Sequence, residues 1–190
     1  MEFTPISEIG TKKLNDRLAT YIGDPSVYGE NSHSIESLHA HFDSKHRLFQ
    51  HSITLVEGIH FDITYTPLEH LGFKAISLLC NEFYTQMGQV LSIGCNLSIP
   101  NRVSVEMVES LVAGLDQGCK DNGCGLAEKN VQSNAQRIII SAYGLCATDK
   151  PITKKIEQVK SGDAICISGD VGAAIAGLRI LMREKKYWQE

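Results

Sequence analysis

The stretch TLVEGIHFDITYTPLEHLGFKA, from Thr54 to Ala75, combines an apolar run with a short group of chemically active side chains. The apolar run ends at Val56, and four residues of interest follow it: Glu57, Gly58, His60 and Asp62. A glutamate and a histidine three residues apart, after a strand, can act in acid–base chemistry or bind a phosphate group. They can equally be solvated polar residues at the end of a strand, and the stretch alone leaves both interpretations open.

Apolar spacing predicts the secondary structure around this stretch. Residues 48–56 are typical of a strand, and residues 61–65, FDITY, are predicted as a second strand. After Pro67 the spacing becomes helical, and Gly88 is expected to end this helix. The apolar positions that define the helix are Leu71, Ala75, Leu78, Leu79 and Phe83.

The rest of the chain continues to interleave helices and strands. Helices are predicted at 6–22, at 104–123 and from 171 onward, and strands at 90–100, 136–147 and 164–168. Ser104 is the expected N-cap of the middle helix and Gly123 its expected stop. This order predicts the α+β class, with a mixed sheet covered by helices on one face.

Composition narrows the class of protein further. The chain has 190 residues, which suits one domain spanning 1–190. Hydrophobic residues make up 43%, charged residues 21%, and the net charge is -4. This balance gives no basic footprint for nucleic acid or an acidic membrane surface, so neither is an expected partner. The N-terminus lacks a secretion signal and no apolar run approaches membrane-spanning length, so a cytoplasmic location is expected.

Cysteine usage agrees with a reducing compartment. The six cysteines are Cys80, Cys95, Cys119, Cys124, Cys146 and Cys166. Most lie inside apolar stretches, so they are predicted to be reduced and buried. Cys119 and Cys124 are too far apart for a CxxC redox motif, and no second pair supports a zinc site.

Two further groups are weaker candidates. The segment ISGDVGAAIAGL, Ile167 to Leu178, contains Gly169, Asp170 and Gly172, which could bring backbone N–H groups to a phosphate. Its spacing fits no standard nucleotide motif, and we favour close packing of a helix of small residues onto the sheet. Histidines also crowd one segment and are more simply interpreted as solvated than as metal ligands: His33, His39, His41, His46 and His51.

Taken in order, these pieces resemble the N-terminal domain of thiamine-monophosphate kinase, in the aminoimidazole ribonucleotide synthetase-related superfamily. The resemblance rests on TLVEGIHFDITYTPLEHLGFKA, CNEFYTQMG, IPNRVSVEMVESLVAGLDQGC and ISGDVGAAIAGLRILMREKK. It implies a dimer formed through the sheets, ATP and magnesium held by clustered aspartates, and thiamine diphosphate as product. It also implies a C-terminal domain, which is expected to be absent from residues 1–190.

The chain departs from the family pattern where the metal ligands are expected. The early Gly-Asp-Asp segment corresponds to Ser34, Ile35 and Glu36, and the aspartate before EGxHF corresponds to Ile53. The aspartate of the helix after LGxKA corresponds to Glu82. The Gly-Gly-Asp-Thr motif corresponds to Glu128, Lys129, Asn130 and Val131. Isoleucine and asparagine remove carboxylates, and magnesium tolerates such changes poorly.

The leading hypothesis is a pseudoenzyme that acts as a dimeric binding or regulatory module. It would pair with itself or with an intact homologue, and would bind a small phosphorylated ligand at Glu57, Gly58, His60, Asp62, Gly169, Asp170 and Gly172. The alternative is a divergent phosphotransferase that uses ATP and Mg, with Glu36, Glu82 and Glu57 around the metal and His60 near a substrate phosphate. A third hypothesis is a sensor that binds a small molecule without turnover.

Overall fold

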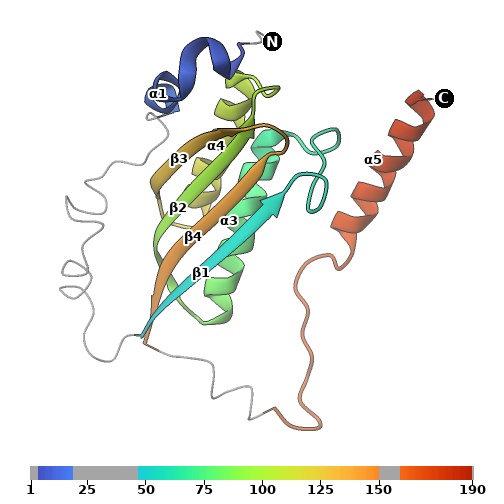
Figure 1. Cartoon of the computed structure of the whole chain (residues 1–190). Coiled ribbons are helices and arrows are strands. Elements are labelled where there is room, and N and C mark those ends of the chain that lie inside the picture. The colour runs from blue at the N-terminus through green and yellow to red at the C-terminus, as the bar shows by residue number, and fades with distance from the viewer. Residues whose placement is uncertain (1–3, 19–46, 150–158, 190) are drawn as a thin grey trace.

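The computed structural model describes residues 4–18, 47–149 and 159–189 (Figure 1). Its elements, in chain order, are α1 (Ile6–Leu18), β1 (Arg47–Val56), α3 (Leu68–Thr85), β2 (Gln89–Pro100), α4 (Val105–Asp121), β3 (Leu126–Asn134), β4 (Ile139–Thr148) and α5 (Ala173–Gln189). Among the sequence expectations, Ile35, Glu36 and the histidines at 33, 39, 41 and 46 lie outside the described residues.

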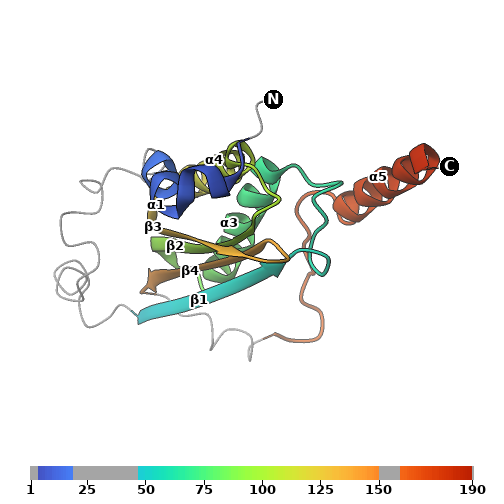
Figure 2. The same cartoon turned by 45° about the horizontal axis from the view of Figure 1, so that its top comes forward.

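The four described strands form one mixed sheet in the order β1-β4-β2-β3. β4 runs antiparallel to both of its neighbours, and β2 and β3 are parallel. Figure 2 shows α1, α3 and α4 on the same side of this sheet, while no described helix covers the opposite side. The predicted α+β class, with a mixed sheet covered by helices on one face, is therefore confirmed.

The core lies between the sheet and the pair α3 and α4. Leu79 of α3 and Leu111 of α4 are fully buried there, as the helical spacing predicted. The two helices approach each other through glycines: a Cβ on Gly114 would lie 1.9 Å from the carbonyl oxygen of Glu69, and a Cβ on Gly72 would lie 2.2 Å from that of Leu111. Only residues without a side chain permit this separation, so the glycines set how closely the helices pack.

The predicted ends of α4 are confirmed. The Ser104 hydroxyl accepts a hydrogen bond of 3.3 Å from the backbone N–H of Met107, which satisfies one of the free donors of the first turn. Gly123 follows the helix with a φ of 68°, and its N–H donates to the carbonyl of Lys120. A left-handed glycine at this position is the usual way to end a helix.

Residues 61–65 are not a strand, in contrast to the prediction. Phe61 makes a single bridge to Glu57, and the chain then turns. The Asp62 carboxylate accepts hydrogen bonds from the N–H and hydroxyl of Thr64, and the Asp62 carbonyl accepts from the N–H groups of Tyr65 and Thr66. An aspartate that bonds its own following backbone favours a turn over an extended chain, and the apolar pattern does not show this.

Two predictions for the C-terminal part of the chain, from residue 164 onward, are also wrong. Residues 164–168, AICIS, form no strand, and Ile165 is 93% exposed. The helix predicted from 171 exists as α5, but its described side chains are largely exposed, and it does not pack onto the sheet through its small residues. A Cβ on Gly177 would meet nothing within 4 Å. Within the described residues, no helix is long and apolar enough to cross a membrane.

The six cysteines are free, and five of them are buried; Cys166 is the exposed one. Burial raises the pKa of the Cys95 thiol to about 12. The prediction of reduced, mostly buried cysteines is confirmed for these residues.

Candidate functional site

The EGIHFD turn that follows β1 is tightly hydrogen-bonded. Gly58, with a φ of 77°, donates its N–H to the carbonyl of Phe61 at 2.7 Å, and His60 donates its N–H to the carbonyl of Val56 at 2.9 Å. The backbone N–H of Val56 donates in turn to Nδ1 of His60 at 3.0 Å. Since Nδ1 is the acceptor, the neutral imidazole carries its proton on Nε2, and that N–H is available to a ligand.

The Glu57 carboxylate is committed to contacts within the protein. Its Oε2 accepts from Nη2 of Arg102 at 2.6 Å and from the N–H of Ile138 at 2.9 Å, and its side chain is 14% exposed. The Glu57 N–H also donates to the carbonyl of Ile138 at 3.0 Å. Glu57 therefore joins the end of β1 to the loop before β4, and it is poorly placed to act as a free general base.

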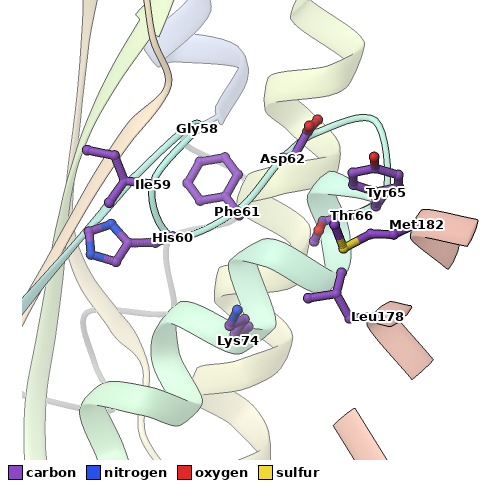
Figure 3. Close-up of a pocket in the computed structure, with 10 residues that line it drawn as sticks. All are labelled: Gly58, Ile59, His60, Phe61, Asp62, Tyr65, Thr66, Lys74, Leu178 and Met182. Atoms are coloured by element: carbon purple, nitrogen blue, oxygen red, sulfur yellow. The ribbon is translucent and has the colours of Figure 1, made fainter. Parts of the chain in front are cut away.

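A cavity of about 350 Å³ lies beside the turn (Figure 3). Its lining residues are Gly58, Ile59, His60, Phe61, Asp62, Tyr65, Thr66, Lys74, Leu178 and Met182. Figure 3 shows that these come from three elements: the turn, α3 with Lys74, and α5 with Leu178 and Met182. A site with one ammonium group, hydrogen-bonding groups and an apolar wall suits a small molecule that has both an anionic group and an apolar part.

Of the seven predicted ligand-binding residues, the structure groups three at this cavity: Gly58, His60 and Asp62. Glu57 lies beside them but faces Arg102. Gly169, Asp170 and Gly172 are exposed residues before α5 and do not line the cavity. Gly169 and Gly172 have positive φ values of 78° and 92°, which shape the chain entering α5.

The positions that correspond to the family's metal ligands are not brought together by the described structure. Ile53 packs against the hydrophobic core on the helix side of β1. Asn130 is exposed on β3, in line with Glu128, which contacts Tyr143 on the open face of the sheet. Ile53 and Asn130 therefore face opposite sides of the sheet.

Glu82 lies far from Glu57, which corrects the hypothesis that both surround one metal. The ring of Phe83, next to Glu82, packs edge-on against His51 with 5.8 Å between centroids. Glu57 is six residues further along β1, a span of about 20 Å at the usual rise of a strand. In the described parts of the chain, no three His, Cys, Asp or Glu side chains group so as to hold a metal ion.

Lys129 turns away from the open face of the sheet. Its Nζ donates to the carbonyl of Leu18 at the end of α1, on the helix side. Burial lowers the pKa of Lys129 to about 8, partly offset by the nearby Asp116 carboxylate. Lys129 and Asn130 therefore lie on opposite sides of the sheet, because adjacent residues of a strand point to opposite faces.

Sequence reasoning missed several residues around the turn. Lys74 lines the cavity and lies within residues 54–75, in LGFKA. The neighbouring residues predict only a helix there, and no motif marks this lysine as a ligand-binding residue. Arg102 and Arg137 come from loops remote in sequence, and only strand pairing brings them to Glu57. A charge-pair search between loops that the sheet joins could have found them.

Comparison with known proteins agrees with this architecture. No family model matches the chain. The thiamine-monophosphate kinase of Aquifex aeolicus is 27% identical over 184 residues, which cover 97% of this chain and 56% of that protein. The chain spans about half the length of the curated relatives it matches.

Solved structures show the same similarity. The crystal structure of thiamine monophosphate kinase from Aquifex aeolicus superposes with a TM-score of 0.65 at 26% identity, over 72% of this chain and 46% of that chain. The E. coli hydrogenase maturation protein HypE gives a TM-score of 0.56 at 16% identity, over 71% of this chain and 42% of that chain, which shows a shared fold. The chain is therefore homologous to the thiamine-monophosphate kinases over nearly all of its length, and it has the α+β fold of the aminoimidazole ribonucleotide synthetase-related proteins.

Proposed function

We propose that this chain is a thiamine-monophosphate-kinase-like module that has lost catalysis and binds a small phosphorylated ligand in the cavity beside the EGIHFD turn. Lys74 would meet the phosphate, His60 would donate from Nε2, and the apolar wall of Leu178 and Met182 would contact the remainder of the ligand. The homology to kinases that act on thiamine monophosphate supports this class of ligand. The residues that line the cavity support this location for the ligand.

One observation carries the loss of catalysis: the partly buried side chain of Ile53 packs against the hydrophobic core. The family resemblance assigns a metal-binding aspartate to this position, and an isoleucine there supplies core packing and no ligand oxygen. A phosphotransferase that relies on magnesium needs several hard oxygen ligands converging on the transferred group. The separation of Glu57 from Glu82 supports the same conclusion.

We also propose that the module is a dimer formed through the open face of its sheet. The outward side chains of β1 and β4 include apolar and aromatic groups that the described chain leaves partly exposed: Leu48, Val56, Ile139, Tyr143 and Leu145. Such a face can pair with a second copy or with an intact homologue, in a cytoplasmic setting. Leu145→Glu should give a monomer by sedimentation, whereas Val171→Glu, which changes an exposed residue away from the sheet, should not.

The ligand proposal is tested by thermal-shift titration with thiamine monophosphate, with ATP, and with magnesium, alone and combined. A ligand at about 100 times its dissociation constant adds roughly 2.7 kcal/mol to stability, which is a shift of several degrees. We expect thiamine monophosphate to stabilise the protein with or without magnesium. Lys74→Gln should weaken this binding by about tenfold or more, because it removes a charge-assisted hydrogen bond. The exposed Lys13 of α1 supplies the matched control, Lys13→Gln.

Turnover decides between the proposal and its alternative. Incubation with ATP, magnesium and thiamine monophosphate should yield no thiamine diphosphate above a no-protein control. If thiamine diphosphate forms, and if Glu82→Gln abolishes its formation, the protein is instead the divergent phosphotransferase. Equal binding of thiamine monophosphate by wild type and Lys74→Gln would show that the cavity is not the binding site.

A further inference from the structure

Two arginines from different loops converge on Glu57. Nη2 of Arg102, in the loop between β2 and α4, donates to Oε2 of Glu57 at 2.6 Å and to the carbonyl of Gln136 at 3.3 Å. Nη1 of Arg137, in the loop between β3 and β4, donates to the Glu57 carbonyl at 3.3 Å. Both guanidinium groups are thus attached to the same residue, one through its carboxylate and the other through its backbone.

Each arginine keeps most of its donors unused by the described residues. A guanidinium group has five N–H donors in a planar fork, and only Nη2 of Arg102 and Nη1 of Arg137 are engaged within the described chain. Arg102 is 47% exposed, while Glu57 beneath it is 14% exposed. One nitrogen of each fork is bonded to Glu57. Arg137 is also exposed, so the remaining donors of both guanidinium groups are accessible to an anion.

The local charge favours an anion. Only Arg102 contacts the Glu57 carboxylate, and Arg137 contacts the backbone carbonyl of the same residue, so the positive charge of Arg137 has no counter-charge within this group. The carboxylate is also bound to the N–H of Ile138, which helps to hold it in place below the arginines. Guanidinium forks match the geometry of phosphate oxygens, and pairs of this kind form strong charge-assisted hydrogen bonds.

The arginine pair adjoins the cavity through Gly58. Gly58 lines the cavity, and a Cβ built on it would lie 3.7 Å from Nη1 of Arg137. One residue of the turn thus separates the cavity from the nearer guanidinium group. A molecule whose body occupies the cavity can extend a second anionic group past Gly58 toward the arginines.

We propose that Arg102 and Arg137, held by Glu57, form an anion subsite that takes the phosphate of a free or esterified small molecule. This inference deepens the proposed function, since the esterified case rests on a ligand in the cavity. The role of Glu57 is then to position Arg102, and the arginines are the residues that touch the anion.

The test is calorimetric titration of the full chain with inorganic phosphate, comparing wild type with Arg137→Gln and Arg102→Gln. Each substitution should weaken phosphate binding at least tenfold. Arg137→Gln is the safer variant for folding, because within the described chain the Arg137 side chain bonds only the Glu57 backbone carbonyl, and its backbone bonds to Asn134 are kept in the variant. The control is Arg17→Gln, which breaks a similarly exposed arginine–glutamate pair, Arg17 with Glu109 at 2.8 Å, elsewhere on the surface. It should change phosphate affinity less than twofold.

Parallel titrations with thiamine monophosphate and with magnesium-free ATP identify the source of the phosphate. An ester that binds at least tenfold more tightly than inorganic phosphate, and needs Arg137, assigns the subsite to a ligand that also fills the cavity. Equal affinities assign it to free phosphate. Phosphate binding unchanged in both arginine variants, or equally weakened in Arg17→Gln, overturns the subsite. In that case thiamine monophosphate binding that depends on Lys74 would still support the proposed function, so the two failures are distinguishable.

Discussion

The phenol of Tyr143 donates a 2.6 Å hydrogen bond to Oε2 of Glu128 across the open face of the sheet. Tyr143 on β4 and Glu128 on β3 are both in register with Gly94 of β2, which lies between them. A Cβ on Gly94 would lie 2.4 Å from the tyrosine ring, so the ring passes directly over the glycine. Burial, and then the bond to Glu128, raises the pKa of the Tyr143 phenol.

Substituting Gly94 should disturb this arrangement. Gly94→Ala places a methyl group where the ring lies, and such overpacking costs about 1–3 kcal/mol of unfolding free energy. The displaced phenol should also lose Glu128, so its pKa should fall toward its ordinary value. Urea denaturation and an absorbance titration measure the two effects. Gly177→Ala, at a glycine with open space around it, should cause no such loss.

The contact of α3 with α4 predicts a larger effect at Gly114. The Cβ of Gly114→Ala would lie 1.9 Å from the Glu69 carbonyl oxygen, which is backbone and cannot rotate away. The helices must separate, so we expect a loss of about 3 kcal/mol, near the upper end for overpacking. Chemical denaturation measures it. A loss no greater than that caused by Gly177→Ala, at a helical glycine with open space around it, would show that the helices tolerate the methyl group.

Restoring an aspartate at position 53 should not restore a metal site. Ile53→Asp places a carboxylate against the core beneath β1, and we expect a loss of about 3 kcal/mol in unfolding free energy. Magnesium should not recover this loss, because Asn130 faces the other side of the sheet. Denaturation with and without magnesium measures both effects, with Ile53→Val as the control. Stabilisation of Ile53→Asp by magnesium would mean that the other ligands are already in place.

Lys129 predicts a pH dependence of stability. Burial lowers the pKa of Lys129 from its ordinary value of 10.5 to about 8, so between these pH values the unfolded chain binds more protons than the folded chain. The contribution of Lys129 to the free energy of unfolding is therefore least favourable below pH 8, and it becomes more favourable as the pH rises toward 10.5. Buried thiols act in the opposite direction above pH 9, because their folded pKa values are raised.

The contribution of Lys129 is isolated by difference. The unfolding free energy of wild type minus that of Lys129→Met should rise between pH 8 and pH 10.5. The same difference for Lys13→Met should stay flat, since Lys13 is exposed on α1. A flat difference for Lys129→Met would mean that the ammonium group is fully solvated in the folded protein.

Local periodicity was sufficient to predict α3, α4, β1, β2 and β4, because their apolar residues recur at the spacing that buries one face. It also identified Ser104 and Gly123, whose roles depend on neighbouring backbone atoms. β3 escaped prediction because its residues do not alternate between apolar and polar. Glu128 and Asn130 face outward there and Lys129 faces inward, so no apolar alternation marks the strand.

The EGIHFD turn was apparent from the sequence, but its chemistry depended on tertiary structure. From the sequence, Glu57 is only a carboxylate near a histidine. The pairing of β1 with β4 shows that this carboxylate accepts hydrogen bonds from Arg102 and from the N–H of Ile138. The apolar segment before α5 was predicted as a strand, yet an extended chain becomes a strand only where a partner strand supplies hydrogen bonds. The sequence by itself determined which segments can bury a face; the tertiary structure decided which residues meet, because contacts between distant segments depend on strand order and helix packing rather than on local spacing.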